Sequence, residues 1–174
     1  MRPFLVEFPA RFPPFPCILL NAQIDLYLTY TDSSGTEVDT VVHVPTASVV
    51  DEDQSTCGTV LDVQGQPILT QVLHINIDHY PGWNVRFAFT KDRLLNAENQ
   101  FVLYQVNVTA DYPSTKTLFN KPPDSVYHYV QPVDLKNVPA VADTIYAHLN
   151  KSLTCIAEQK FIINKDPKQG PLAS

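Results

Sequence analysis

CILLNAQIDLYLTYT, residues 17–31, carries the clearest periodic pattern in the chain. Apolar residues occupy every second position from Ile18 to Tyr30, and mostly polar residues occupy the positions between them. Such alternation places one row of side chains in a core and the other toward water, whereas a helix would scatter the apolar residues around its circumference. The pattern predicts one long β-strand over residues 17–31 and an all-β fold.

Length and composition limit the classes of function. A chain of 174 residues is long enough for one domain with a substantial core. Fifteen prolines against five glycines favour many strand ends and stiff loops over helices. The formal net charge of −6 argues against nucleic acid as a partner, because phosphate neutralisation needs clustered Lys and Arg. It also argues against electrostatic docking on an anionic membrane surface.

Further strand-like stretches follow the first, separated by turn residues. The turn sequence DSSG, residues 32–35, joins the opening strand to residues 38–44, which predicts a hairpin. The other expected strands are residues 58–63, 68–79, 83–90, 101–110, 126–131, 144–149 and 153–163. The expected domain therefore spans residues 17–163, and residues 164–174 are expected to form a linker or tail.

Residues 1–16 form an arm rich in proline and phenylalanine, which is expected to be extended and unable to pair inside a sheet. Its phenylalanines are Phe4, Phe8, Phe12 and Phe15. One interpretation is a segment that binds a partner, and the other is a lead-in whose phenylalanines cover an edge of the core.

Two polar stretches invite a metal-site interpretation. His74, Asn76 and Asp78 alternate with apolar residues and share one strand face, and the loop of residues 46–56 carries neighbouring acidic residues. Asparagine is a poor metal ligand, and a calcium loop needs a sharp glycine turn that residues 46–56 lack. We therefore interpret the first as the water-facing side of an antiparallel strand and the second as a solvated loop. No metal or cofactor is expected.

The strand of residues 83–90 begins with the only tryptophan. Trp83, Val85, Phe87 and Phe89 are expected to point inward, and Asn84, Arg86, Ala88 and Thr90 outward. The indole is expected in the core with its N–H near a rim, where it can find a hydrogen-bond acceptor.

The sequence offers no catalytic motif. The five histidines, His43, His74, His79, His128 and His148, are scattered, and the chain contains neither Gly-x-Ser-x-Gly nor His-Glu-x-x-His. A hydrolase remains an alternative only because catalytic triads form in space and not in sequence. We therefore expect that the chain is not an enzyme, and we assign no catalytic residue.

Two sequons suggest passage through the secretory pathway. They are Asn107-Val108-Thr109 and Asn150-Lys151-Ser152, with Asn107 and Asn150 as the candidate glycosylated residues. No apolar run reaches the roughly 18 residues that a spanning helix needs. Attachment to a membrane is therefore expected only through a segment outside these residues.

The order of several motifs resembles the luminal domain of the lysosome-associated membrane protein family. They are Cys17-Ile18-Leu19 at the start of the alternating strand, Cys57-Gly58 after a loop, Trp83 before VRFAF of residues 85–89, and LTCIAEQ of residues 153–159. The resemblance implies a β-prism of bent antiparallel sheets tied by a disulfide. Since there is no mucin-like hinge, the chain is most similar to the single-domain, lightly glycosylated branch.

The family pattern pairs four cysteines first to second and third to fourth, which implies a disulfide between Cys17 and Cys57. Closing that loop would add about 3 to 4 kcal/mol to the free energy of unfolding. Cys155 would then be unpaired or bonded to a cysteine outside these residues.

The resemblance also implies a non-enzymatic domain in the lumen of endosomes, lysosomes or synaptic vesicles, with the cell surface as a further location. Its expected role is membrane-protein trafficking or sorting through protein–protein contacts, with a vesicular transporter as one cargo and self-association as an option. The alternative is a secreted β-sandwich that binds carbohydrate or lipid. An immunoglobulin-like domain fits less well, because its tryptophan lies between its two paired cysteines, whereas Trp83 follows both Cys17 and Cys57.

Overall fold

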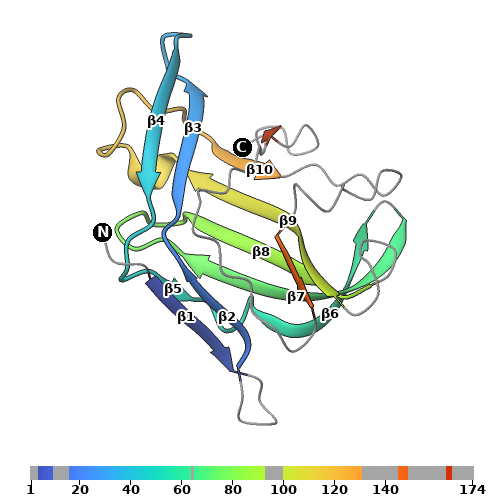
Figure 1. The fold of residues 1–174 in the computed structure, drawn as a ribbon. Helices are drawn as coiled ribbons and strands as arrows, with labels where there is room; N and C mark the ends of the chain where they lie inside the picture. Colours follow the sequence, from blue (N-terminus) through green and yellow to red (C-terminus); the bar gives the residue numbers. More distant parts are fainter. Residues whose placement is uncertain are drawn as a thin grey trace.

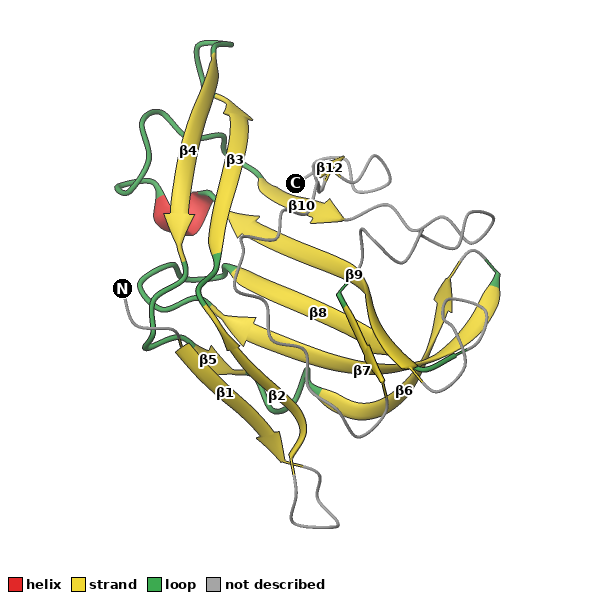
Figure 2. Cartoon of the chain, viewed as in Figure 1, coloured by secondary structure: helices red, strands yellow, loops and turns green. Residues whose placement is uncertain are grey.

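The computed structural model describes residues 4–9, 16–63, 65–92, 100–130, 145–148 and 164–165. These residues form antiparallel strands and one short 3-10 turn, η1 (Pro113–Thr115), as Figure 2 shows. The predicted all-β fold class is confirmed, since the regular elements of the described residues are strands apart from this turn. Every described strand pairing is antiparallel, as predicted.

The largest sheet has eight strands, with β7, β8 and β9 at its centre (Figure 1). Its path runs β12-β10-β9-β8-β7-β5, while β11 also pairs with β9 and β6 also pairs with β7. The strands are β5 (Val49–Val50), β6 (Thr56–Val63), β7 (Gln66–Asn76), β8 (Asn84–Thr90), β9 (Gln100–Asp111), β10 (Val126–Val130), β11 (Tyr146–His148) and β12 (Asn164–Lys165). We call it the main sheet.

Two further sheets are two-stranded. One joins β1 (Phe4–Pro9) to β2 (Pro16–Ala22), and the other joins β3 (Asp25–Thr31) to β4 (Glu37–His43). The predicted hairpin after the opening strand is confirmed, because Thr31 pairs with Glu37 around the turn. Asp32 closes that turn by accepting hydrogen bonds from the backbone N–H groups of Ser34 (2.8 Å) and Thr36 (2.9 Å).

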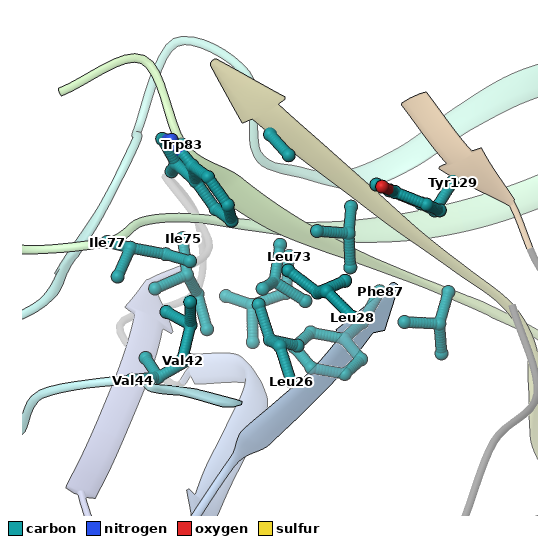
Figure 3. Packing of buried hydrophobic residues seen from close by; sticks show 14 of the residues in the cluster. Leu26, Leu28, Val42, Val44, Leu73, Ile75, Ile77, Trp83, Phe87 and Tyr129 are labelled. Atoms are coloured by element: carbon teal, nitrogen blue, oxygen red, sulfur yellow. The ribbon is translucent and has the colours of Figure 1, made fainter. Parts of the chain in front are cut away.

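The main core lies between one face of the main sheet and these smaller sheets. Leu26 and Leu28 of β3 and Val42 of β4 belong to the same buried cluster as Leu73 and Ile75 of β7. Figure 3 shows hairpin and main-sheet side chains meeting there, with Trp83 and Tyr129 in the same cluster. The alternation in the opening stretch thus correctly predicted the burial of Ile18, Leu26, Leu28 and Tyr30. The other inward residues, Leu20, Ala22 and Ile24, are half-buried.

A second, smaller core lies on the opposite face of the main sheet. It contains Val63, Ile68, Ala88, Val102 and Tyr104. Since alternate residues of a strand face opposite sides, Ile68 and Ala88 point away from the main core. This corrects the prediction that the outward row of residues 83–90 faces water throughout, because Ala88 and Thr90 are buried.

The opening stretch is two strands and not one. β2 ends at Ala22 and β3 begins at Asp25, and the Ile24 carbonyl between them accepts a hydrogen bond from Val44 N–H at 2.9 Å. The chain passes there from one two-stranded sheet to the other. Alternation reports which side chains are buried but not which partner strand they pair with, so the predicted single strand is wrong.

Two segments predicted to lie outside the sheets pair instead. β1 forms an antiparallel ladder with β2, from Phe4 opposite Ala22 to Phe8 opposite Ile18. The paired stretch contains no proline before Pro9, where the register shifts, so its N–H groups can donate to the ladder. Asn164 and Lys165, predicted to belong to the tail, pair with β10. The predicted strand of residues 153–163 lies wholly outside the described residues.

Candidate functional site: a polar face of the main sheet

The strand register aligns polar residues into two rows across the main sheet. In the first row Asn76 pairs with Asn84, Asn84 with Thr109, and Thr109 with His128. In the second row His74 pairs with Arg86, and Arg86 pairs with Asn107. We call this set the polar face; its residues are His74, Asn76, Asn84, Arg86, Asn107, Thr109 and His128.

The two-residue period of the strands puts these side chains opposite the main core. Their neighbours Ile75, Val85 and Val108 are buried in that core, so the intervening polar residues must point to the other side. Every residue of the polar face is partly or fully exposed. The predicted water-facing row at His74 and Asn76 is therefore confirmed.

Asp51 borders the polar face and is held by its own turn. Its Oδ2 accepts a hydrogen bond from Asn76 Nδ2 at 3.2 Å, and its Oδ1 accepts from the backbone N–H groups of Asp53 and Gln54, both at 3.1 Å. These hydrogen bonds, with that from Asn76 the largest cause, lower the pKa of the Asp51 carboxyl. Asp51 is thus an ionised group whose two oxygens both accept hydrogen bonds from within the chain.

His74 lies between this carboxylate and a guanidinium. Partial burial is the largest cause that lowers the pKa of its imidazole, and Arg86 lowers it further, whereas Asp51 opposes the shift. Its backbone is fixed on both sides, because Ser55 Oγ accepts from His74 N–H at 2.9 Å and Asp51 N–H donates to the His74 carbonyl at 2.9 Å. At neutral pH the His74 imidazole is uncharged.

Arg86 is the fixed positive charge of the polar face. In the amide orientation that satisfies both polar atoms of Asn107, the Asn107 oxygen accepts from Arg86 Nη1 at 3.2 Å and its nitrogen donates to the Val106 carbonyl at 3.1 Å. The close contacts between basic and acidic side chains among the described residues involve other residues, namely His43, His79 and Lys116. Within that part of the chain, Arg86 has neutral partners only.

The structure does not bring together the residues that were considered as metal ligands. His74 and Asn76 belong to β7, but Asp78 lies in the following turn, where it pairs with His79 at 3.1 Å. Residues 46–56 include strand β5 and the turn that Asp51 closes. Among the described residues, no three His, Cys, Asp or Glu side chains gather into a group that could hold a metal ion.

Cys57 is disulfide-bonded, and it packs against the main core that includes Ile18. The backbone of Cys17 lies in β2, but its side chain and all of Cys155 lie outside the described residues. A disulfide at Cys57 agrees with the predicted framework. The pairing of Cys17 with Cys57, and the fate of Cys155, stay predictions.

Asn107 and Thr109 of the first sequon both lie on the polar face. Thr109 Oγ1 is 3.3 Å from His128 Nδ1, and the Asn107 amide contacts Arg86. Because alternate strand residues share a face, an Asn-x-Thr triplet in a strand necessarily presents both side chains on one side. Asn150 lies outside the described residues. Glycosylation of Asn107 and of Asn150 stays a prediction.

The predicted partner-binding phenylalanines are only partly placed. Phe4 and Phe8 lie in β1, whose side chains are outside the description, and Phe12 and Phe15 lie outside the described residues altogether. The sequence indicated three residues at the centre of the polar face individually, but it did not predict that they lie together. His74, Arg86 and Asn107 come from three strands, and only their register brings them together.

Comparisons with known proteins leave the family open: no family model matches the chain, and the search of curated proteins also finds no match. The described residues contain no helix with the length and apolarity needed to span a membrane. The resemblance to the lysosome-associated membrane protein family therefore remains a prediction based on the motifs quoted above.

Proposed function

We propose that this chain is a non-enzymatic recognition domain in the lumen of endosomes, lysosomes or vesicles, as part of a membrane glycoprotein. It acts in membrane-protein trafficking or sorting through protein–protein contacts, and a vesicular transporter is one suitable cargo. Attachment to the membrane is assigned to a segment outside these residues. The resemblance carried by Cys17, Cys57, Trp83 and residues 153–159 supplies this expectation.

The disulfide at Cys57 is the observation that carries the proposal. Disulfides persist in oxidising compartments and are rare in the cytosol, where thiols are kept reduced. The secretory and endosomal lumen and the cell surface meet this condition. The sequon at Asn107 lies on a partly exposed face, which agrees with the same route.

The polar face supports recognition over catalysis. Its groups are amides, a hydroxyl, imidazoles and one guanidinium, spread over four strands. The two carboxylates at its border are engaged within the chain, Asp51 with Asn76 and its own turn and Asp111 with Ser114. An exposed set of hydrogen-bonding groups on a rigid sheet suits contact with a partner that covers several strands.

Gene deletion followed by rescue tests this function. Loss of the protein is expected to deplete at least one multi-pass membrane protein from the endosomal, lysosomal or vesicle fraction, measured by quantitative proteomics. Wild-type protein should restore it, whereas the double variant N84A/H128A on the polar face should not. The control Y27A changes a side chain that is 67% exposed on the β3–β4 hairpin and should restore it. Normal membrane-protein levels after deletion, or full rescue by N84A/H128A, would refute the proposal.

A further inference from the structure

We propose that the polar face binds an acidic sugar residue of a glycan, with the sugar carboxylate on the Arg86 guanidinium. This inference rests on the proposed recognition function and names the chemistry of a partner for the same face. A glycosylated membrane protein would supply such a sugar.

The first argument is charge. The chain has a formal net charge of −6, yet the guanidinium of Arg86 contacts no carboxylate among the described residues. Two acids border this face: Asp51 accepts hydrogen bonds from Asn76, Asp53 and Gln54, and Asp111 accepts from Ser114. Arginine presents a planar fork of donors that matches a carboxylate in two parallel hydrogen bonds. A partly exposed arginine with neutral partners therefore favours an anionic ligand.

The second argument is the neutral surroundings of Arg86. Asn84 and Thr109 in the adjacent row offer an amide and a hydroxyl group that suit the hydroxyl and acetamido groups of a sugar. Val49 lies cross-strand from Asn76 and is 61% exposed, so it provides an apolar contact at the border. These groups surround one fixed charge, as recognition of a single carboxylated sugar requires.

The third argument separates a sugar from an acidic peptide. Extended peptides commonly bind by adding a strand to a free sheet edge. β8 pairs with β7 and β9 on its two sides, and β7 and β9 also have partners on both sides. The polar face thus offers side chains only, without a backbone edge at Arg86, and this favours a sugar.

His74 makes binding depend on pH. It faces Arg86 across the strands, Asp51 at the border and Asn76 on its own strand. A bound carboxylate beside His74 favours the protonated imidazole, so acidification adds positive charge where the ligand sits. Affinity for the acidic sugar is expected to rise from pH 7.5 to pH 5.5, as in an acidifying compartment.

Titration calorimetry and NMR on the folded protein test this inference, with 3′-sialyllactose as probe and lactose as its neutral counterpart. The acidic trisaccharide should bind and lactose should bind about tenfold more weakly or not at all, because a charge-assisted pair is lost. R86Q should weaken binding at least about tenfold. K91Q removes the same charge at an exposed residue after β8 and should leave binding unchanged. H74Q should flatten the pH dependence.

Several outcomes would overturn the inference. Equal binding of lactose, equal effects of R86Q and K91Q, or inorganic sulfate as tight as the trisaccharide would each do so. Tighter binding of polyglutamate would assign the face to an acidic peptide. Complete glycosylation of Asn107, seen by mass spectrometry together with no binding, would assign it to the chain's own glycan. Trp83 fluorescence reports whether R86Q is folded, and N84A provides a second variant that keeps Arg86.

The test separates this inference from the proposed function. If no sugar binds but N84A/H128A still fails to rescue, the acidic-sugar inference is wrong and the recognition function stands.

Discussion

At the residue scale, Gly82 allows the turn between β7 and β8 to close against the end of β9. Its φ of +76° is a left-handed conformation that glycine adopts without a steric penalty. A Cβ atom there would lie 2.8 Å from Asp111 Cβ. The next residue, Trp83, donates from Nε1 to the Asp111 carbonyl at 2.9 Å, and it is 1% exposed. The close approach of the Gly82 backbone to Asp111 thus helps to place the Trp83 indole in the core.

Replacing Gly82 with alanine is therefore expected to cost more than the same change at Gly35. Gly35 also has a positive φ, +85°, but its added Cβ would meet no atom within 4 Å. G35A should lower the free energy of unfolding by about 1 kcal/mol through the backbone alone, and G82A by about 2 to 3 kcal/mol. Urea unfolding followed by far-UV circular dichroism measures both. Equal losses would show that the contact with Asp111 relaxes without cost.

At the scale of elements, β7 shows how far the sequence predicts the fold. Alternation correctly assigned Leu73, Ile75 and Ile77 to the core, and His74 and Asn76 to the opposite side. Leu69, predicted to belong to the same inward row, is 48% exposed because it lies beyond the part of the sheet that the main core covers.

The opposite face of β7 carried a signal that the prediction overlooked. Ile68 and Val72 alternate with Leu69 and Leu73, so the first half of the strand is apolar on both faces. This pattern indicates a strand with apolar contacts on both faces, and indeed Ile68 belongs to the second core and Leu73 to the main core. The grouping around Arg86 carried no such signal, because register between strands depends on the whole set of pairings.

The second core is expected to depend on one buried hydroxyl pair. Thr70 Oγ1 of β7 lies 2.8 Å from the Tyr104 hydroxyl of β9, and it also bonds the Ile68 carbonyl at 3.1 Å. Burial raises the pKa of Tyr104, which keeps its hydroxyl protonated. T70V should cost about 1 to 3 kcal/mol because the Tyr104 hydroxyl stays buried without this partner, and Y104F about 1 kcal/mol.

A double-mutant cycle on urea unfolding checks this pair. T70V/Y104F should cost less than the sum of the single changes, by about 1 kcal/mol, since removing both groups leaves no orphaned hydroxyl at Tyr104. Additive losses would mean that the two hydroxyls do not stabilise each other.

At the scale of the whole molecule, the response to acid follows from a few groups with shifted pKa values. Hydrogen bonds from Ser34 and Thr36 lower the pKa of Asp32, and that of Asp51 is lowered mainly by Asn76. Such carboxylates stabilise the fold above their unfolded-state pKa of about 3.9, and this contribution is lost only as the pH falls further. Both therefore keep their stabilising charge at pH 5, which agrees with the proposed residence in an acidic lumen.

His74 acts over a higher range of pH. Its pKa in the folded protein lies below the unfolded value of about 6.5, so the unfolded chain takes up the proton first. The contribution of His74 to stability is thus full above about pH 6.5 and is lost as the pH falls toward the folded pKa. We predict a urea midpoint that declines gently from pH 7.5 to pH 5 while the protein without denaturant stays folded.

The variant H74Q separates this contribution from the rest of the molecule. Because glutamine does not titrate, its urea midpoint should change less with pH than that of the wild type over the same range. N84Q alters the same face without removing a titratable group and should keep the wild-type slope. Equal slopes for H74Q and wild type would contradict the role of His74. Unfolding at pH 5 without urea would count against residence in an acidic lumen, and with it against the compartment in which the acidic-sugar site is expected to work.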